Sequence, residues 1–279
     1  MDPIEHNSLR FGIITDIHYA ADDTDLNARE AAQSILCCTA RWQEMGTEFV
    51  VQLGDLISRE GHEAETDLLE VRKMLAGYTG PMIHVPGNHC LAVPPDRLFG
   101  ILGIPAPYYS FTAGTIRFIV LNSMDVSVHS EPDTDRDRRM LTHYRDEVQA
   151  LFYCGAVGTR QQEWLVHELD ASVRDRQLVI VLSHLPLLEE TTDEKHGLCW
   201  NHQEVTEILF RYSNIRACIS GHYHPGAYAS RNGIHFIVIP GFISRSEPPY
   251  FSCGIVEITS GRLRISAIDG TILHDLDFS

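Results

Sequence analysis

The chain has 279 residues, of which 44% are apolar, a composition typical of a globular protein with a large core. A formal net charge of −16 disfavours nucleic acid and anionic membrane surfaces, so we expect neither as a partner. The seven cysteines are odd in number and form no C-x-x-C pair, which argues against a disulfide framework and favours a reducing cytoplasm. Neither a signal peptide nor a membrane-spanning segment is expected, because neither apolar pattern is present. Nothing in the sequence indicates an oligomeric state.

The first third of the chain alternates short apolar runs with amphipathic segments. The apolar runs predict strands over 11–15, 49–53 and 81–85, and the segments between them predict helices over 26–45 and 61–75. This β-α-β-α-β order is typical of parallel strands joined by helical crossovers. The helical spacing in 26–45 places on related faces Ala28, Ala31, Ile35, Leu36 and Trp42.

The middle of the chain contains a predicted hairpin and then a charged insert. Residues 108–112 and 116–121 flank Ala113-Gly114-Thr115, which predicts two strands joined by a tight turn. Residues 124–154 are charged and irregular, and two interpretations remain open. The insert is either a solvated loop or surface helix, or a lid over the site, since long loops in compact domains are often functional.

The last part of the chain is rich in predicted strands. Helices are predicted over 159–173, with Thr159 as a possible N-cap, and over 201–212. Apolar runs predict strands over 178–182, 215–219, 226–230, 234–239, 252–258 and 262–268. We find no repeat or linker and therefore expect a single domain spanning residues 1–279.

Five short motifs each follow a predicted strand. They are Asp16-Ile17-His18, Gly54-Asp55, Gly87-Asn88-His89, Ser183-His184 and Gly221-His222-Tyr223-His224. Because ligands gather beyond the carboxyl ends of strands in α/β sheets, we expect the motifs to meet at one site. Their two carboxylates, one amide and five imidazoles are enough to hold two metal ions. A nitrogen and oxygen donor set without thiolate suits manganese, iron or zinc better than calcium.

The spacing within the motifs predicts how the side chains point. In extended backbone, residues i and i+2 point the same way, so Asp16 and His18 could face one metal together, as could His222 and His224. Asn88 and its neighbour His89 should point differently, with Asn88 at a metal and His89 toward a substrate. Asp55 is the best candidate for a shared carboxylate, whose charge offsets the repulsion between two cations. The glycines at 54, 87 and 221 suit sharp turns and close backbone approach.

The order and spacing of the five motifs resemble the calcineurin-like metallophosphoesterase superfamily over nearly the whole chain. The resemblance implies an α/β (α+β) fold, a four-layer αββα sandwich of two mixed β-sheets flanked by helices. It also implies one metal ion on Asp16, His18, Asp55 and His224, and a second on Asp55, Asn88, His184 and His222. A metal-bound hydroxide would attack phosphorus in line, and His89 would protonate the leaving oxygen or stabilise charge on the phosphoryl group. One departure is Cys90, where the superfamily usually has an acidic residue that orients the histidine.

Several stretches outside the metal motifs resemble the manganese-dependent ADP-ribose/CDP-alcohol diphosphatase group. These are 155–158 with 161–165, 184–187, 198–201, 221–228, and 233–236 before Pro240-Gly241. The resemblance implies two divalent ions, manganese first, and hydrolysis of a small nucleoside-diphosphate-linked molecule such as ADP-ribose or a CDP-alcohol. One alternative is a 3′,5′-cyclic-nucleotide phosphodiesterase, against which Cys90 weighs. The other is a non-catalytic protein-binding scaffold, although no ligand position is missing here.

Four further residues are candidates for substrate contact. Arg59 could bind a phosphate oxygen through its guanidinium, or it could be a solvated residue near a helix start. Cys199, Trp200 and Asn201 could line a nucleoside pocket, with Trp200 stacking on a base. The alternative for Trp200 is packed core beside a helix N-cap at Asn201.

Overall fold

The computed structural model describes residues 8–21 and 26–278. The helical segments are α1 (Leu26–Glu44), α2 (His62–Leu75), η1 (His89–Ala92), α3 (Pro95–Leu102), α4 (Asp135–Thr142), η2 (His143–Glu147), α5 (Thr159–Arg174), η3 (Glu189–Thr191), α6 (His202–Leu209) and η4 (Phe242–Ser244). The strands are β1 (Leu9–Ile14), β2 (Val50–Gln52), β3 (Met82–His84), β4 (Tyr109–Ala113), β5 (Ile116–Val120), β6 (Leu178–Leu182), β7 (Ile215–Ser220), β8 (Ala227–Arg231), β9 (Ile234–Val238), β10 (Gly254–Thr259), β11 (Arg262–Ala267) and β12 (Ile272–Asp277).

The strands form two mixed sheets. In the first, the order is β12-β11-β10-β1-β2-β3, and in the second it is β4-β5-β6-β7-β9-β8. Strands β1, β2 and β3 run parallel, as the β-α-β-α-β pattern predicted. The hairpin predicted around Gly114 is confirmed as the antiparallel pair β4–β5.

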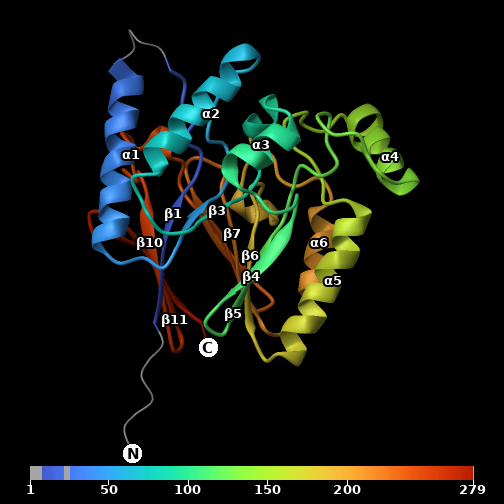
Figure 1. Ribbon diagram of the computed structural model, residues 1–279. Coiled ribbons are helices and arrows are strands. Elements are labelled where there is room, and N and C mark those ends of the chain that lie inside the picture. Colours follow the sequence, from blue (N-terminus) through green and yellow to red (C-terminus); the bar gives the residue numbers. More distant parts are fainter. Residues whose placement is uncertain (1–7, 22–25, 279) are drawn as a thin grey trace, which may run out of the picture.

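The two sheets pack face to face and helices cover their outer faces, so the predicted four-layer sandwich is confirmed. Figure 1 shows α1 and α2 on one side of the strands and α5 and α6 on the other. Along β1, Phe11 and Ile13 enter the core between the sheets, while Ile14 joins the core beneath α1 and α2. Along β5, Phe118 faces the central core and Ile119 faces the helices of the second sheet. This period of two explains why both sheets read as apolar runs, since each has two buried faces.

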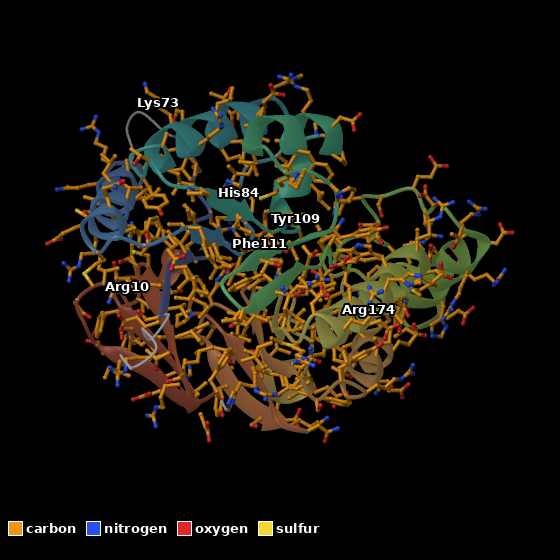
Figure 2. All side chains as sticks on the ribbon, turned by 60° about the horizontal axis from the view of Figure 1, so that its bottom comes forward. Arg10, Lys73, His84, Tyr109, Phe111 and Arg174 are labelled. Atoms are coloured by element: carbon orange, nitrogen blue, oxygen red, sulfur yellow. The ribbon has the colours of Figure 1, made fainter. Side chains whose placement is uncertain are left out.

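Aromatic contacts join the two sheets, and a hydrogen bond links their edge strands β3 and β4. The Phe11 ring of β1 lies 5.5 Å from the Phe118 ring of β5 in an edge contact. The Tyr109 hydroxyl donates to the His84 carbonyl across 2.9 Å, and both residues lie near the middle of the molecule in Figure 2. These contacts fix the sheets relative to one another, and therefore also the strand ends that carry the motifs.

Some local predictions were wrong. The helix α5 begins at Thr159, but its N-cap is Gly158, so Thr159 does not cap the helix. The Leu36 side chain is 51% exposed and does not share the buried face of α1 with Ile35, because adjacent helix positions point about 100° apart. The insert 124–154 is not irregular throughout, since it contains α4 and the π-helical η2.

The helix α3 and the strand β12 lie outside the predicted elements. The helix α3 starts with Pro95 and ends before Gly103, which adopts φ 69°. These are ordinary start and stop signals for a helix. The last strand, β12, completes a hairpin with β11. None of the helices in the described residues has the length and apolar character needed to cross a bilayer.

Candidate metal centre

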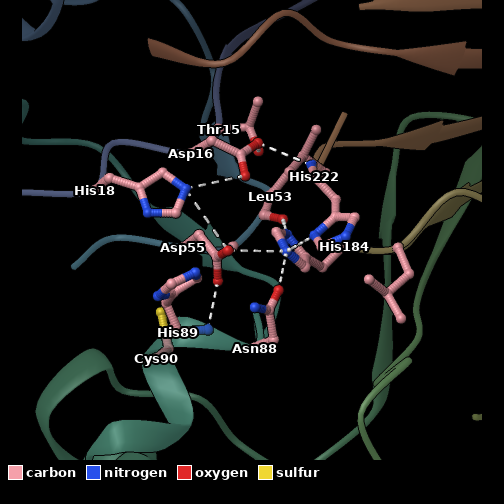
Figure 3. A network of polar contacts seen from close by, with 12 residues as sticks. Thr15, Asp16, His18, Leu53, Asp55, Asn88, His89, Cys90, His184 and His222 are labelled. Carbon is pink, nitrogen blue, oxygen red and sulfur yellow. Dashed lines mark hydrogen bonds and ion pairs between the residues drawn. The ribbon is translucent and has the colours of Figure 1, made fainter. Parts of the chain in front are cut away.

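The five motifs converge at the carboxyl ends of strands from both sheets. Asp16 follows β1 and Asp55 follows β2, while Asn88 lies in the loop after β3. His184 and His222 follow β6 and β7 of the second sheet. The prediction that these strand ends would meet is confirmed, and Figure 3 shows the resulting network.

The backbone of the first two motifs is left-handed, not extended. Asp16, His18 and Asp55 have φ values of 50°, 49° and 53°. The prediction from extended alternation was therefore wrong in its reason, although both Asp16 and His18 reach the site. Hydrogen bonds between the two loops hold this conformation, from Asp16 N–H to the Gly54 carbonyl (3.1 Å) and from His18 N–H to the Asp55 carbonyl (3.0 Å). Strained backbone of this kind is held in place by its surroundings and clusters at functional sites.

The motif glycines allow the loops to approach one another closely, as predicted. A Cβ atom on Gly87 would lie 2.3 Å from the backbone nitrogen of Asp55. One on Gly221 would lie 2.0 Å from the Thr15 hydroxyl. Gly54 has φ +110°, which side chains rarely adopt, and its Cβ would meet His184. A larger residue at these positions would push the motifs apart.

The first group of donor atoms is Asp16 Oδ1, His18 Nε2 and His224 Nε2. The His18 and His224 nitrogens lie 3.2 Å apart. Asp16 Oδ1 lies 3.7 Å from His18 Nε2 and 3.6 Å from His224 Nε2. On its other side, His18 Nε2 lies 3.8 Å from Asp55 Oδ2. These separations are those of atoms that can share one central ion.

The second group surrounds His184 Nε2. This nitrogen lies 3.2 Å from Asp55 Oδ2, 2.9 Å from Asn88 Oδ1 and 3.2 Å from His222 Nδ1. Asp55 Oδ2 therefore faces both groups, as expected of a shared carboxylate. All seven residues predicted as metal ligands lie in these two groups.

Backbone carbonyls fix which ring nitrogen of two histidines faces the site. His184 Nδ1–H donates to the Leu53 carbonyl across 2.8 Å, and His222 Nε2–H donates to the His196 carbonyl across 2.8 Å. Each ring then turns its other nitrogen toward the site. This arrangement is typical of histidines that bind metal.

The Asp16 carboxylate tests whether a cation fits this site. Its Oδ2 accepts from the Thr15 hydroxyl (2.6 Å) and from His222 N–H (2.9 Å). Its Oδ1 is buried and has no hydrogen-bond partner in the part of the chain that the structure describes. A buried carboxylate oxygen without a partner is costly unless something binds it. The nitrogen and oxygen donors around it fit a divalent ion such as manganese, iron or zinc.

The charges of the site already favour ionised carboxylates. Burial acts to raise the pKa of Asp16, but the neighbouring His18 and His224 rings hold it well below its usual range. Burial acts to lower the pKa of His184, but the negative charges of Asp55 and Asp16 raise it to about 9. The two carboxylates thus keep their negative charge, which a bound cation needs.

His89 sits at the edge of the centre and is held by its backbone. Its N–H donates to Asp55 Oδ1 across 2.9 Å, and its ring contacts the His18 ring edge-on at 4.7 Å. Burial lowers its pKa. Cys90 does not orient this ring, since its buried sulfur accepts the Leu56 N–H at 3.3 Å.

A cavity of 570 Å³ opens over the metal-site residues. Besides predicted ligands and His89, its lining includes Glu60, His129, Phe152, Tyr153, Lys195 and His196. Sequence reasoning missed this set as site residues. The aromatic pair lies inside the charged insert, and a single lysine carries no motif.

None of the four predicted substrate contacts lines this cavity, and their role in substrate binding stays a prediction. Arg59 forms ion pairs with Glu63 and Asp67 beside α2. Trp200 is 8% exposed and stacks on Tyr144 at 5.4 Å, which agrees with the packed-core alternative. Cys199 and Asn201 are buried. Asn201 is the N-cap residue of α6, as the packed-core alternative predicted, but its side chain bonds the Val157 backbone and not the first turn of the helix.

Comparison with known proteins agrees with this geometry. The profile of the calcineurin-like phosphoesterase family matches residues 9–226. A manganese-dependent ADP-ribose/CDP-alcohol diphosphatase of Arabidopsis thaliana is 28% identical over 296 residues, covering 93% of this chain and 94% of the relative. The protein of the same name from Oryza sativa subsp. japonica is 28% identical over 297 residues, with 93% and 91% covered.

A solved structure supports the fold. The crystal structure of a dimetal phosphatase from Danio rerio superposes with a TM-score of 0.82 at 23% identity, covering 97% of this chain and 99% of that one. The family profile spans most of the chain and includes the motifs that meet at the site. The chain therefore belongs to the calcineurin-like phosphoesterase family.

Proposed function

We propose that this metal-dependent hydrolase cleaves the diphosphate linkage of a small nucleoside-diphosphate-linked molecule of the ADP-ribose or CDP-alcohol type. The observation that carries the proposal is the pair of donor groups that share Asp55 Oδ2 at the floor of an open cavity. The names of the curated relatives, which span nearly the whole chain, support the choice of substrate class.

We assign two divalent ions to the two donor groups, with manganese as the leading candidate. One group is Asp16, His18, Asp55 and His224, and the other is Asp55, Asn88, His184 and His222. When bound, two such ions supply positive charge to the attacking and leaving oxygens of an in-line displacement.

The protein groups around the ions position the substrate. The backbone contact with Asp55 holds His89 at the rim of the cavity, where its imidazole can hydrogen-bond a phosphoryl or leaving oxygen. His184 and His222 keep fixed ring orientations through the Leu53 and His196 carbonyls, so their donor nitrogens need no rearrangement.

Product analysis tests this function. The manganese-loaded protein is incubated separately with ADP-ribose, CDP-choline and 3′,5′-cyclic AMP. We expect AMP from the first and CMP from the second, with cyclic AMP unchanged. AMP from cyclic AMP alone would favour the cyclic-nucleotide phosphodiesterase, and no turnover of any substrate would favour the scaffold.

We also propose that residues 124–154 act as a lid of a single domain. His129, Phe152 and Tyr153 from this insert line the cavity. Hydrogen exchange with and without α,β-methylene-ADP measures whether the insert closes over the cavity. We expect slower exchange in the insert when the nucleotide is bound. Equal exchange in both samples would argue against a lid.

The cysteines are all free in the described structure, which supports a cytoplasmic location.

A further inference from the structure

Two segments far apart in the sequence form one wall of the cavity. The Tyr153 hydroxyl donates to the Lys195 carbonyl, 42 residues away in sequence. The Cys154 sulfur lies 3.5 Å from the His196 carbonyl, which in turn accepts the hydrogen bond from His222. The wall is therefore tied directly to a residue of the metal centre, and the side chains it carries have a defined place beside that centre.

Lys195 brings a cation to this wall. It is one of two lysines in a chain whose formal net charge is −16. It lines the cavity, and its ammonium group takes part in no ion pair or hydrogen bond with any residue in the described ranges. Glu60 also lines the cavity but is not paired with it. An unpaired cation beside a phosphate site is available to bind an anionic substrate.

Phe152 brings an exposed aromatic ring to the same wall. Its side chain is 66% exposed, and its ring contacts the Tyr153 ring edge-on at 5.2 Å. A ring that is exposed to this extent has face area available for stacking. Any nucleobase can stack on such a face, because every base has a π-face.

We propose that Phe152 and Lys195 form the nucleotide-recognition subsite of the cavity. Phe152 stacks on the nucleobase, and the Lys195 ammonium binds non-bridging oxygens of the diphosphate. The proposal rests on the proposed function and deepens it, because it names the residues that select a nucleoside diphosphate over a simple phosphate ester.

The test uses two probes that separate the two contacts. α,β-Methylene-ADP carries both a base and a diphosphate, whereas methylenediphosphonate carries only the diphosphate. Dissociation constants for the manganese-loaded protein are measured by calorimetry, together with KM and kcat for ADP-ribose. The matched controls are Tyr250→Ala, which truncates an aromatic side chain that is 65% exposed and outside the cavity, and Lys73→Gln, which neutralises the other lysine. Lys73 lies at the periphery in Figure 2.

Phe152→Ala is expected to weaken α,β-methylene-ADP about tenfold and to raise KM for ADP-ribose by a similar factor, with a smaller effect on methylenediphosphonate. Lys195→Gln is expected to weaken both probes about three- to tenfold. Neither control should change either constant. A Phe152→Ala protein with unchanged affinity for α,β-methylene-ADP would overturn the stacking role, and unchanged affinity of Lys195→Gln for both probes would overturn the phosphate role.

The failure of this subsite and the failure of the proposed function give different results. If the wild-type protein hydrolyses ADP-ribose but the variants bind like the controls, only the subsite is wrong. If the wild-type protein neither hydrolyses ADP-ribose nor binds α,β-methylene-ADP, the function is wrong and the subsite with it. Thermal unfolding of each variant checks the fold, and a purely structural role would lower the melting temperature and affect kcat as much as KM.

Discussion

Asp55 holds His89 at the metal centre, because Asp55 Oδ1 accepts the backbone N–H of His89 across 2.9 Å. The other oxygen of the same carboxylate faces His184 at 3.2 Å and His18 at 3.8 Å. One buried side chain thus connects the two donor groups to the loop that carries His89. His89 takes part in this contact through its main chain only, so the roles of the Asp55 and His89 side chains can be separated by mutation.

Replacing Asp55 with Asn should damage both metal binding and turnover. The amide keeps the size of the side chain but removes the negative charge shared by the two donor groups. We expect a loss of turnover of more than about 100-fold and a manganese content below two ions per chain, measured by elemental analysis. Asp175→Asn, a surface carboxylate paired with Arg117, is the control. Full turnover with two bound ions in Asp55→Asn would contradict the assignment.

Replacing His89 with Ala should separate chemistry from metal binding. The backbone hydrogen bond to Asp55 remains in this variant, so we expect the manganese content to stay at the wild-type value. Loss of a positioned imidazole should reduce kcat by about 10²–10⁴-fold. His167→Ala, on an exposed part of α5, is the control. Because His89 also lies within reach of His18 and Asp55, loss of an ion in His89→Ala would instead identify it as a ligand.

The motifs predicted the residues of the centre, because parallel strands bring their carboxyl ends to one edge whatever the loops do. They did not predict the left-handed backbone at Asp16 and His18, which depends on hydrogen bonds to the loop after β2. Nor could they predict the wall that carries Phe152 and Lys195, since it forms only when two distant segments meet. Trp200 shows the opposite case. Its sequence position between two metal motifs suggested a place in the nucleoside pocket, but the ring packs in the core against Tyr144.

The start of α5 depends on a residue of the insert. Its N-cap is Gly158, which has no side chain to accept a hydrogen bond, and Asp137 Oδ1 accepts both Thr159 N–H (2.9 Å) and the Thr159 hydroxyl (2.7 Å) instead. Asp137→Ala should therefore cost about 1 kcal/mol, as loss of a helix cap does. For a domain of this size we expect the melting temperature to fall by about 2–4 °C.

The control for this prediction is Asp135→Ala, because Asp135 lies in α4 together with Asp137. The Asp135 side chain is 81% exposed and pairs only with Arg138 among the described residues, so its removal should change stability little. Equal melting temperatures for the two variants would show that Asp137 does not support α5.

His84 should make the stability of the protein fall in mild acid. Its ring is buried, with Nδ1 at 3.3 Å from the Gln52 side chain, and burial together with the positive charge of Arg72 lowers its pKa from 6.5 to about 4. Between these values the unfolded chain binds a proton that the folded chain does not. The free energy of unfolding must therefore decrease as the pH falls from 6.5 to about 4. Below about pH 4, His84 causes no further decrease.

His84→Asn removes this proton-linked loss while keeping an N–H that can reach Gln52. We expect the variant to be less stable than the wild type at about pH 7.5, because it loses buried ring contacts. The difference in melting temperature between wild type and variant should narrow by several degrees at about pH 5. Only the wild type is destabilised there, because it must keep a buried imidazole neutral. Both proteins are measured with chelator present, so that metal binding does not contribute, and His62→Asn on the exposed start of α2 is the control. A gap that stays constant between the two pH values would mean that His84 titrates alike in the folded and unfolded chain, and that its burial does not govern acid stability.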